Sequence, residues 1–174
     1  VGWQAGDLIT AYARPTVGKT WLCCKLASDA IRSGYKTLLV STEMTSSAIA
    51  LRMDVLLGQS LGYKLSHSAL RNGRAIDENE YKKFLTEVNF KNLEDSISLP
   101  SITNLVRKYS PDVLIIDGVY LISTADRNKA AWEQSHSLFY GLKTMALSTN
   151  TTVIASTQAT RDASNMYNQP TAGQ

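Results

Sequence analysis

Residues Ala13 to Thr20 (ARPTVGKT) have the types and spacing of a phosphate-binding loop. A small residue is followed by four free positions and then by Gly18, Lys19 and Thr20, which is the P-loop pattern with Ala13 in place of its first glycine. In such a loop, N–H groups at a helix start bind phosphate, the lysine contacts the β and γ phosphates, and the hydroxyl binds Mg²⁺. The sequence therefore predicts a nucleoside triphosphate site with its metal ion.

Three more polar side chains stand at or just after apolar runs that predict strands. Asp117 ends such a run (VLIID), where it can hold Mg²⁺ directly or through water, or else stabilise a loop. Glu43 can orient and deprotonate an attacking water, or else cap the next helix. Gln158 follows the last run, where its amide can sense a γ-phosphate or form an ordinary loop hydrogen bond.

Short apolar runs alternate with amphipathic stretches along the chain, a pattern that predicts an α/β fold with a mostly parallel sheet flanked by helices. We predict strands at 7–11, 36–41, 96–99, 113–117 and 152–156, and helices at 19–33, 45–57, 77–89, 101–109 and 130–148. Thr45, a capping box from Asp77 to Glu80, and Ser101 are the expected helix starts, and Gly58 is expected to end the second helix. The polar stretch 59–74 predicts a surface loop with room for one helical turn.

Bulk properties favour one domain over residues 1–174. The chain is long enough, and at 44% hydrophobic apolar enough, to bury one sizeable core. Its net charge of +3 fits a nucleic-acid partner but is also common among ordinary proteins. The adjacent Cys23 and Cys24 form neither a disulfide framework nor a metal site, and His67 and His136 are isolated, which favours structural or surface roles. The cysteines favour a reduced intracellular protein, and because no apolar run reaches the length of a membrane span, we expect a soluble one.

The chemical residues sit in longer runs that resemble the ATPase domain of DnaB-type replicative helicases. The matching runs are GDLITAYARPTVGKT, VSTEM, VLIIDGVYLI and STQATR, beginning at Gly6, Val40, Val113 and Ser156. Shorter matches, ALRM from Ala50, LRNG from Leu70 and LKTMA from Leu142, occur in the same order. The resemblance covers nearly the whole chain, and its most specific parts are the P-loop and the Glu43–Met44 pair.

The resemblance implies a RecA-like fold that binds ATP and Mg²⁺, forms a hexameric ring and moves along single-stranded DNA in the central channel. It also implies a primase and a helicase loader as partners, no membrane association, and a place in the cytoplasm of a bacterial cell or phage-infected host. By position, Lys19 and Thr20 match the phosphate and metal contacts, Glu43 the catalytic base, Asp117 the Walker B acid and Gln158 the γ-phosphate sensor. The expected nucleotide-binding set is Arg14, Pro15, Thr16, Val17, Gly18, Lys19, Thr20 and Asp117.

Two departures from the family pattern indicate a divergent member, such as one from a phage. Family members have Asp-Tyr-Leu-Gln-Leu where this chain has DGVYL, and Gln-Leu-Asn-Arg where it has QATR. The family's ATPase domain also continues to a basic hairpin with an arginine finger, which nothing here matches, and its N-terminal domain is missing. We therefore expect a domain truncated at both ends, which turns over slowly alone because such a finger is worth about 10³ to 10⁵ in rate.

Several side chains carry two interpretations. Arg127 and Lys129 in one loop, and Arg161 after the last strand, are expected to meet DNA phosphates, or else to be solvated loop charges. Trp132 and Tyr120 can stack on a base, but packing against the sheet or an adjacent subunit is the favoured interpretation. The remaining ambiguous side chain is that of Arg14, which can reach a phosphate, a neighbouring subunit or only solvent.

A helicase motor is the leading hypothesis, and two other classes remain as alternatives. A RecA-type recombinase or recombination mediator uses a similar core and a similarly placed glutamate, although the order of the Glu43–Met44 and Gln158 blocks favours the helicase. A small-molecule kinase would need an acceptor pocket and an acid-rich or arginine-rich lid, and no segment of the sequence matches either.

Overall fold

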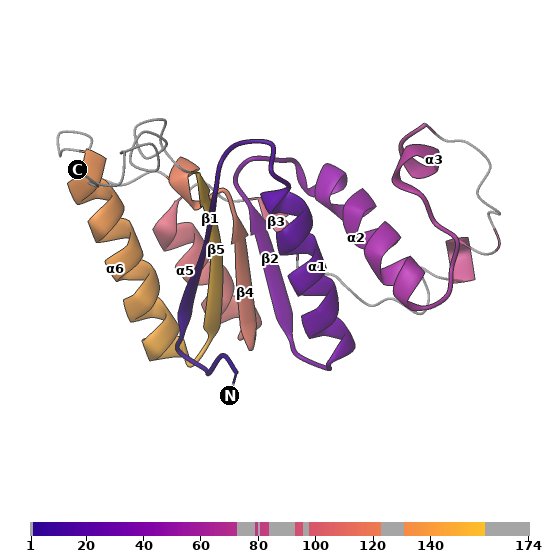
Figure 1. Cartoon of the computed structure of the whole chain (residues 1–174). Coiled ribbons are helices and arrows are strands. Elements are labelled where there is room, and N and C mark those ends of the chain that lie inside the picture. Colours follow the sequence, from indigo (N-terminus) through magenta and orange to yellow (C-terminus); the bar gives the residue numbers. More distant parts are fainter. Residues whose placement is uncertain are drawn as a thin grey trace, which may run out of the picture.

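The computed structural model describes residues 2–72, 79, 81–83, 93–95, 98–122 and 131–158. Its centre is a five-stranded sheet with the order β1-β5-β4-β2-β3, in which every neighbouring pair is parallel. The strands are β1 (Leu8–Ala13), β2 (Thr37–Ser41), β3 (Leu93–Asp95), β4 (Val113–Asp117) and β5 (Thr152–Gln158). Helices lie on both sides of the sheet, so the predicted α/β class is confirmed (Figure 1).

The helices form two layers. One layer contains α1 (Lys19–Arg32) and α2 (Ser46–Ser60), with the short α3 (His67–Arg71) beyond them, and the other contains α5 (Leu99–Tyr109) and α6 (Ala131–Thr149) (Figure 1). A 3₁₀ turn, η1 (Val119–Leu121), follows β4. Residues 79 and 81–83 are also helical, and the rest of the helix predicted at 77–89 lies outside the described residues.

Each layer has its own apolar core because successive strand side chains point to opposite faces of the sheet. On β2, Leu38 and Val40 belong to the cluster with α5 and α6, whereas Leu39 between them belongs to the cluster with α1 and α2. All three side chains are completely buried. The central strands are therefore apolar on both faces, as the continuous run in β4 predicts.

Three sequence predictions about these elements are wrong. The strand predicted at 96–99 does not reach its expected end, because helix α5 already begins at Leu99, and a strand of this region lies earlier, at β3. Ser98 caps α5 in place of the predicted Ser101: its side chain accepts a hydrogen bond from the Ser101 N–H at 3.3 Å, and Pro100 follows in the first turn. Gly58 does not end α2, which continues to Ser60. A glycine is required at this position because Leu65 packs close to the helix.

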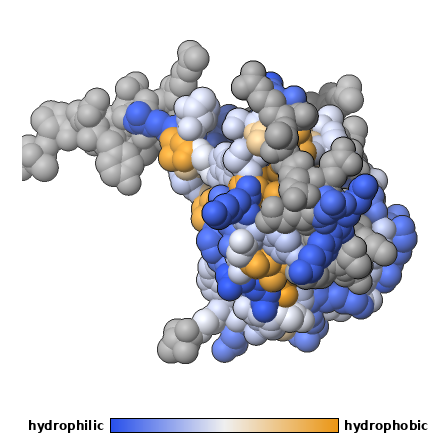
Figure 2. Space-filling view, turned by 90° about the vertical axis from the view of Figure 1, so that its right-hand side faces the viewer, coloured by the Kyte–Doolittle hydropathy of each residue, from blue (hydrophilic) through white to orange (hydrophobic). Residues whose placement is uncertain are grey.

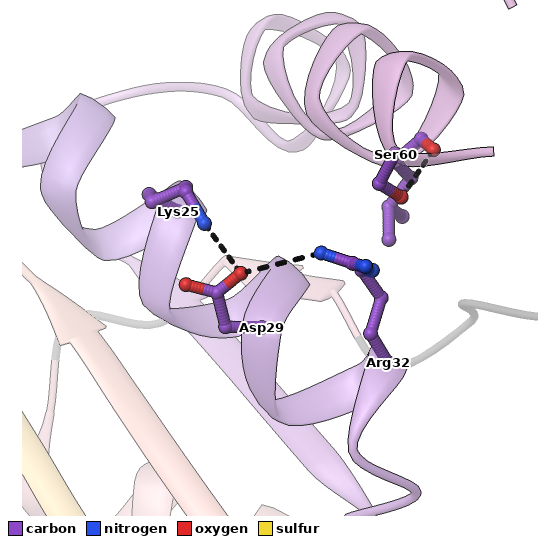
Figure 3. A network of polar contacts seen from close by, with 5 residues as sticks. Lys25, Asp29, Arg32 and Ser60 are labelled. Atoms are coloured by element: carbon purple, nitrogen blue, oxygen red, sulfur yellow. Dashed lines mark hydrogen bonds and ion pairs between the residues drawn. The ribbon is translucent and has the colours of Figure 1, made fainter. Parts of the chain in front are cut away.

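The outer side of the α1–α2 layer carries charged side chains. On α1, Asp29 forms ion pairs with Lys25 and, at 3.9 Å, with Arg32, all three on the solvent side of the helix (Figure 3). The space-filling view in Figure 2 shows that apolar residues form small separate patches among hydrophilic side chains on this part of the surface. Helix α1 therefore packs one face against the sheet and exposes the other to water. Among the helices that the structure describes, none is long and apolar enough to cross a bilayer.

Candidate functional site

The strand register brings the predicted chemical residues to one edge of the sheet. Ala13, the first residue of the P-loop pattern, is the register partner of Gln158, and Ser41, two residues before Glu43, is the partner of Asp117. All of these positions lie at the carboxyl ends of parallel strands, where open α/β sheets bind their ligands. The loop from β1 to α1 passes over this edge, at the top of Figure 1.

The loop between β1 and α1 contains two positions of left-handed backbone and leads into a helix without a side-chain cap. Gly18, the N-cap of α1, has φ 96°, and Thr16 also has a positive φ, of 64°. Since Gly18 has no side chain, no capping oxygen covers the first N–H groups of α1, and the positive end of the helix dipole faces the loop. Such a helix start binds anions readily.

Lys19 places a cation inside this loop. It is only 9% exposed, and its Nζ donates to the carbonyl oxygens of Ala13 at 3.3 Å and Arg14 at 3.0 Å. Within the described part of the chain, no acidic side chain forms an ion pair with it. A buried ammonium held only by carbonyl groups retains most of its attraction for an anion.

A pocket of about 290 Å³ opens beside the loop, and its lining mixes predicted residues with unexpected ones. The predicted members of its lining are Pro15, Thr16, Gly18, Lys19, Thr20, Glu43 and Gln158. Arg14 and Val17 are exposed and do not line it. The structure therefore brings the P-loop, the proposed base and the proposed sensor into contact with one space.

Two lining residues were not found from the sequence. Trp21, in the first turn of α1, and Arg52, on α2, both border the pocket. The Arg52 guanidinium lies 5.4 Å from the ring centroid of Trp21, donates to the Ala48 carbonyl at 2.8 Å, and leaves its buried Nε without a partner among the described residues. His67 packs edge-on against Trp21 with ring centroids 5.7 Å apart, which gives it the structural role expected for it. The available signal for Arg52 was its place in the ALRM run that resembles the family.

Asp117 ends β4 at the same edge of the sheet and is completely buried. One carboxylate oxygen, Oδ1, accepts from Ser156 Oγ at 2.9 Å, and Ser156 in turn accepts from the Gly118 N–H at 2.9 Å. The other oxygen, Oδ2, has no hydrogen-bond partner among the described residues. Buried carboxylate oxygens are normally bound by a hydrogen-bond donor, a water or an ion, so this atom has room to take a ligand.

The turn after Asp117 is tied to the start of the Glu43 loop. Thr42 donates from its N–H and its hydroxyl to the Asp117 carbonyl, both at 3.0 Å, and the same hydroxyl lies 2.5 Å from the Gly118 carbonyl. Gly118 has φ 91°, and a Cβ there would lie 2.7 Å from Thr42 Oγ1 and 3.3 Å from Glu43 Cβ. Only a glycine fits this backbone and this contact.

Tyr120 lies beside the two polar groups expected to do chemistry. Its hydroxyl accepts from Gln158 Nε2 at 2.5 Å and lies near the Glu43 carboxylate. Burial of the hydroxyl raises the pKa of Tyr120 to about 12, and the Glu43 carboxylate contributes to the rise. The sequence did not predict this contact between Tyr120 and Gln158, and packing of Tyr120 against an adjacent subunit stays a prediction.

The remaining predicted residues lie elsewhere. Arg127, Lys129 and Arg161 are outside the described residues. Trp132, at the start of α6, is 70% exposed, so it does not pack against the sheet, and its packing against an adjacent subunit stays a prediction. Cys23 and Cys24 are free and lie on the buried face of α1.

Comparison with known proteins identifies the family. The family model of the DnaB-like helicase C terminal domain matches residues 1–172. The replicative DNA helicase DnaB of Geobacillus stearothermophilus is 27% identical over 172 residues, which cover 92% of this chain and 37% of that protein. This chain spans between 17% and 38% of the length of the curated relatives it matches.

Solved structures agree on the fold. A structure described as an ATPase domain superposes with a TM-score of 0.73 at 21% identity, covering 98% of this chain and 64% of that one. A DnaB-like replicative helicase, described with its interactions with primase, superposes with a TM-score of 0.75 at 23% identity over 99% of this chain and 43% of that one. With a family model that matches almost every residue, the chain belongs to the DnaB-like helicase C-terminal domain family.

Proposed function

We propose that this chain is the motor domain of a replicative DNA helicase, which hydrolyses a nucleoside triphosphate to move along single-stranded DNA. One observation carries the proposal: Lys19, Glu43 and Gln158, from three separate segments, line a single pocket at the sheet edge where the buried Asp117 ends β4. Membership of the DnaB-like family favours this motor over a RecA-type recombinase with a similar core.

The residues present fit a Mg²⁺ ion. The unpartnered Oδ2 of Asp117 is a buried anionic oxygen of the kind that hard cations bind, directly or through water. We propose that Thr20, through its hydroxyl, and Asp117 hold the metal. When bound, the ion neutralises charge on the β and γ phosphate oxygens.

The remaining groups have distinct roles in the proposed hydrolysis. Lys19 exchanges its bonds to the loop carbonyls for phosphate oxygens, helped by the uncapped start of α1. Glu43 accepts a proton from the attacking water, and the half-buried Gln158 senses the terminal phosphate with its amide. Arg14 and Val17, which do not line the pocket here, contribute at most through their backbone.

The remaining parts of the function are inferred from the family. We propose a homo-oligomeric ring, with six subunits, around single-stranded DNA, in which a neighbouring subunit supplies the arginine finger. Arg127, Lys129 and Arg161 are proposed DNA contacts, and a primase and a helicase loader are proposed partners in the cytoplasm of a bacterium or a phage-infected host. ATP is the proposed nucleotide.

Two assays on the complete protein test the proposal. Single-stranded DNA is expected to stimulate ATP hydrolysis, and a forked duplex is expected to be unwound only with ATP and Mg²⁺. Strand pairing without unwinding would support a recombinase and contradict the proposed helicase motor. Hydrolysis that requires a small-molecule phosphate acceptor and ignores DNA would support a kinase.

Two substitutions separate binding from turnover. Lys19→Ala is expected to lower both nucleotide affinity and turnover at least about 10²-fold, because the buried cation of the loop is removed. Glu43→Gln is expected to keep binding and lose about 10² to 10⁴ in turnover, because an amide cannot accept the proton. Lys25→Ala, on the solvent side of the same helix, is the matched control and should change neither. Turnover of the Glu43→Gln protein at the unchanged rate would remove Glu43 from the catalytic role.

A further inference from the structure

The side chains that line the pocket beside the P-loop fall into two groups. Glu43 and Gln158 stand after β2 and at the end of β5, whereas Trp21 and Arg52 belong to helices α1 and α2 on one side of the sheet. The P-loop leads from β1 into α1 and so connects the two groups. The proposed hydrolysis gives a role to the loop and to the strand-end group, but none to the helix group.

The chemistry of the substrate indicates what the helix group contacts. The P-loop and the strand-end group are assigned to the triphosphate and its metal, which leaves the ribose and the base. A base is flat and aromatic, and every base has a face that stacks on aromatic rings and on guanidinium planes. Among the described residues that line the pocket, only Trp21 and Arg52 carry such groups.

The indole ring of Trp21 is held in a fixed orientation. The guanidinium carbon of Arg52 lies 5.4 Å from the ring centroid, and the Arg52 Nη1 is itself fixed by donating to the Ala48 carbonyl at 2.8 Å. His67 packs edge-on against the same ring, at an interplanar angle of 69°. With these contacts in place, Trp21 is still 39% exposed. A flat surface that is already oriented loses little conformational freedom when a ligand stacks on it.

This pair of side chains cannot recognise the hydrogen-bonding edge of adenine. Strong selection between two similar substrates requires polar groups that pair with the one and not the other. The indole N–H and the guanidinium only donate, so neither accepts from the exocyclic amine of adenine. The carboxylate and the amide among the described lining residues, Glu43 and Gln158, belong to the strand-end group.

We propose that Trp21 and Arg52 form a stacking wall for the nucleotide base, which accepts ATP and GTP alike because it contacts the face of the base and not its edge. Trp21 supplies the ring, and Arg52 fixes that ring and extends the flat surface with its guanidinium. The inference rests on the proposed nucleotide site and adds its substrate class, purine nucleoside triphosphates without selection between them.

The test measures binding to the complete protein by titration calorimetry in the presence of Mg²⁺. The ligands are the non-hydrolysable β,γ-imido analogues of ATP and GTP and, as a ligand without a base, inorganic tripolyphosphate. The two analogues should bind the unsubstituted protein with Kd values within about threefold of each other, since stacking is tolerant of base identity. A Kd for one analogue more than about 10-fold below that of the other would overturn the absence of edge recognition.

Substitution of the ring tests the wall directly. Trp21→Leu should raise the Kd of both analogues roughly 10-fold and that of tripolyphosphate by less than about twofold, because only the stacking surface is lost. Trp21→Phe, which keeps an aromatic ring, should recover most of the affinity. Trp3→Leu, at an exposed tryptophan on the opposite edge of the sheet, is the matched control and should change no Kd. An equal loss for all three ligands in Trp21→Leu would overturn the contact with the base.

Arg52→Gln tests the second member of the wall. The Kd of both analogues should rise about threefold, with that of tripolyphosphate less affected, because the cation over the ring is removed. A loss that is as large for tripolyphosphate would place Arg52 on the phosphates and overturn its part in the wall. If the unsubstituted protein binds neither the analogues nor tripolyphosphate, the proposed nucleotide site fails; if it binds all three and Trp21→Leu matches it, only the stacking wall fails.

Discussion

Two aspartates stand at the two ends of strand β4, and they are used in opposite ways. Asp112, just before the strand, is exposed, and its Oδ2 accepts from the Lys36 N–H at 2.8 Å. Asp117, the last residue of the strand, is completely buried, and its Oδ2 has no partner among the described residues. The exposed carboxylate caps a backbone N–H, whereas one oxygen of the buried carboxylate has no partner among the described residues.

The same difference extends along the two edges of the sheet. At the amino edge, polar side chains end on backbone groups: the Thr151 hydroxyl donates to the Pro111 carbonyl at 3.0 Å, and the Thr152 hydroxyl to the Gln4 carbonyl at 3.0 Å. At the carboxyl edge, α1 starts without a side-chain cap, and Asp117 Oδ2 has no partner among the described residues. Unused hydrogen-bonding capacity, rather than the number of polar residues, distinguishes a binding edge from a structural one.

The largest expected effect comes from neutralising the buried aspartate. Asp117→Asn should lower Mg²⁺-dependent turnover by about 10²-fold, because the proposed metal loses its anionic oxygen. Its Oδ1 can still accept from Ser156, and the uncompensated buried charge is gone, so the free energy of unfolding should not fall. Magnesium titration of ATP hydrolysis and urea unfolding measure the two quantities. A large loss of stability with normal turnover would make Asp117 structural.

Asp112→Ala is the matched change at the other end of the strand. The Lys36 N–H loses its acceptor, but the site is exposed and water can replace it, so the loss in unfolding free energy should be about 1 kcal/mol. Turnover should be unchanged. A fall in turnover here would break the contrast between the two edges.

The second prediction compares two glycines with positive φ. Gly118→Ala, at φ 91°, should lower the free energy of unfolding by about 2 to 4 kcal/mol, since strain adds to a clash with Thr42 Oγ1 at 2.7 Å. Turnover should fall as well, because Glu43 Cβ is the next contact, at 3.3 Å. Gly34→Ala, at φ 84° with open space around it, should cost only about 1 to 2 kcal/mol and leave turnover intact. Equal effects at both glycines would show that the turn after β4 does not constrain the site.

The sequence predicts those parts of the site that consist of consecutive residues. The P-loop pattern lies between a strand and a helix, and the apolar run ending in Asp117 is a strand buried on both faces, so each could be located without knowing its neighbours. The order of the strands then brings them to one edge, as parallel βαβ units require.

The missed residues depend on contacts between distant segments. Tyr120 reaches Gln158 only because η1 directs its hydroxyl there, and nothing in the letters around it indicates this. The sequence predicts a strand that ends at Leu99 and therefore misses Ser98 as the helix cap, although Pro100 favours a helix start. Gly58 resembled a helix end, but its role is to admit Leu65 against α2. Packing decided each case.

The smallest effects are expected at the two cysteines beneath the carboxyl edge. Burial raises the pKa of Cys23 and of Cys24 to about 12, and the charge of Asp117 contributes to both rises. Since thiolate is the reactive form, a thiol reagent at pH 8 should label neither in the native protein, whereas the unfolded chain should react at both. Because these pKa values are raised above the ordinary 9.0, the stability they contribute is fully present below pH 9 and is lost as the pH rises toward 12.

The same labelling connects the cysteines to the contrast between the two aspartates. Asp117→Asn should lower the pKa of Cys23 by removing a nearby negative charge, but burial is the larger cause, so labelling at pH 8 should remain far slower than in urea. Asp112→Ala, at the far end of β4, should leave the labelling rate unchanged. Rapid labelling of the unsubstituted protein would mean that α1 separates from the sheet on the time scale of the reaction. The uncapped helix start and Lys19 would then be held less firmly than a preformed phosphate site requires.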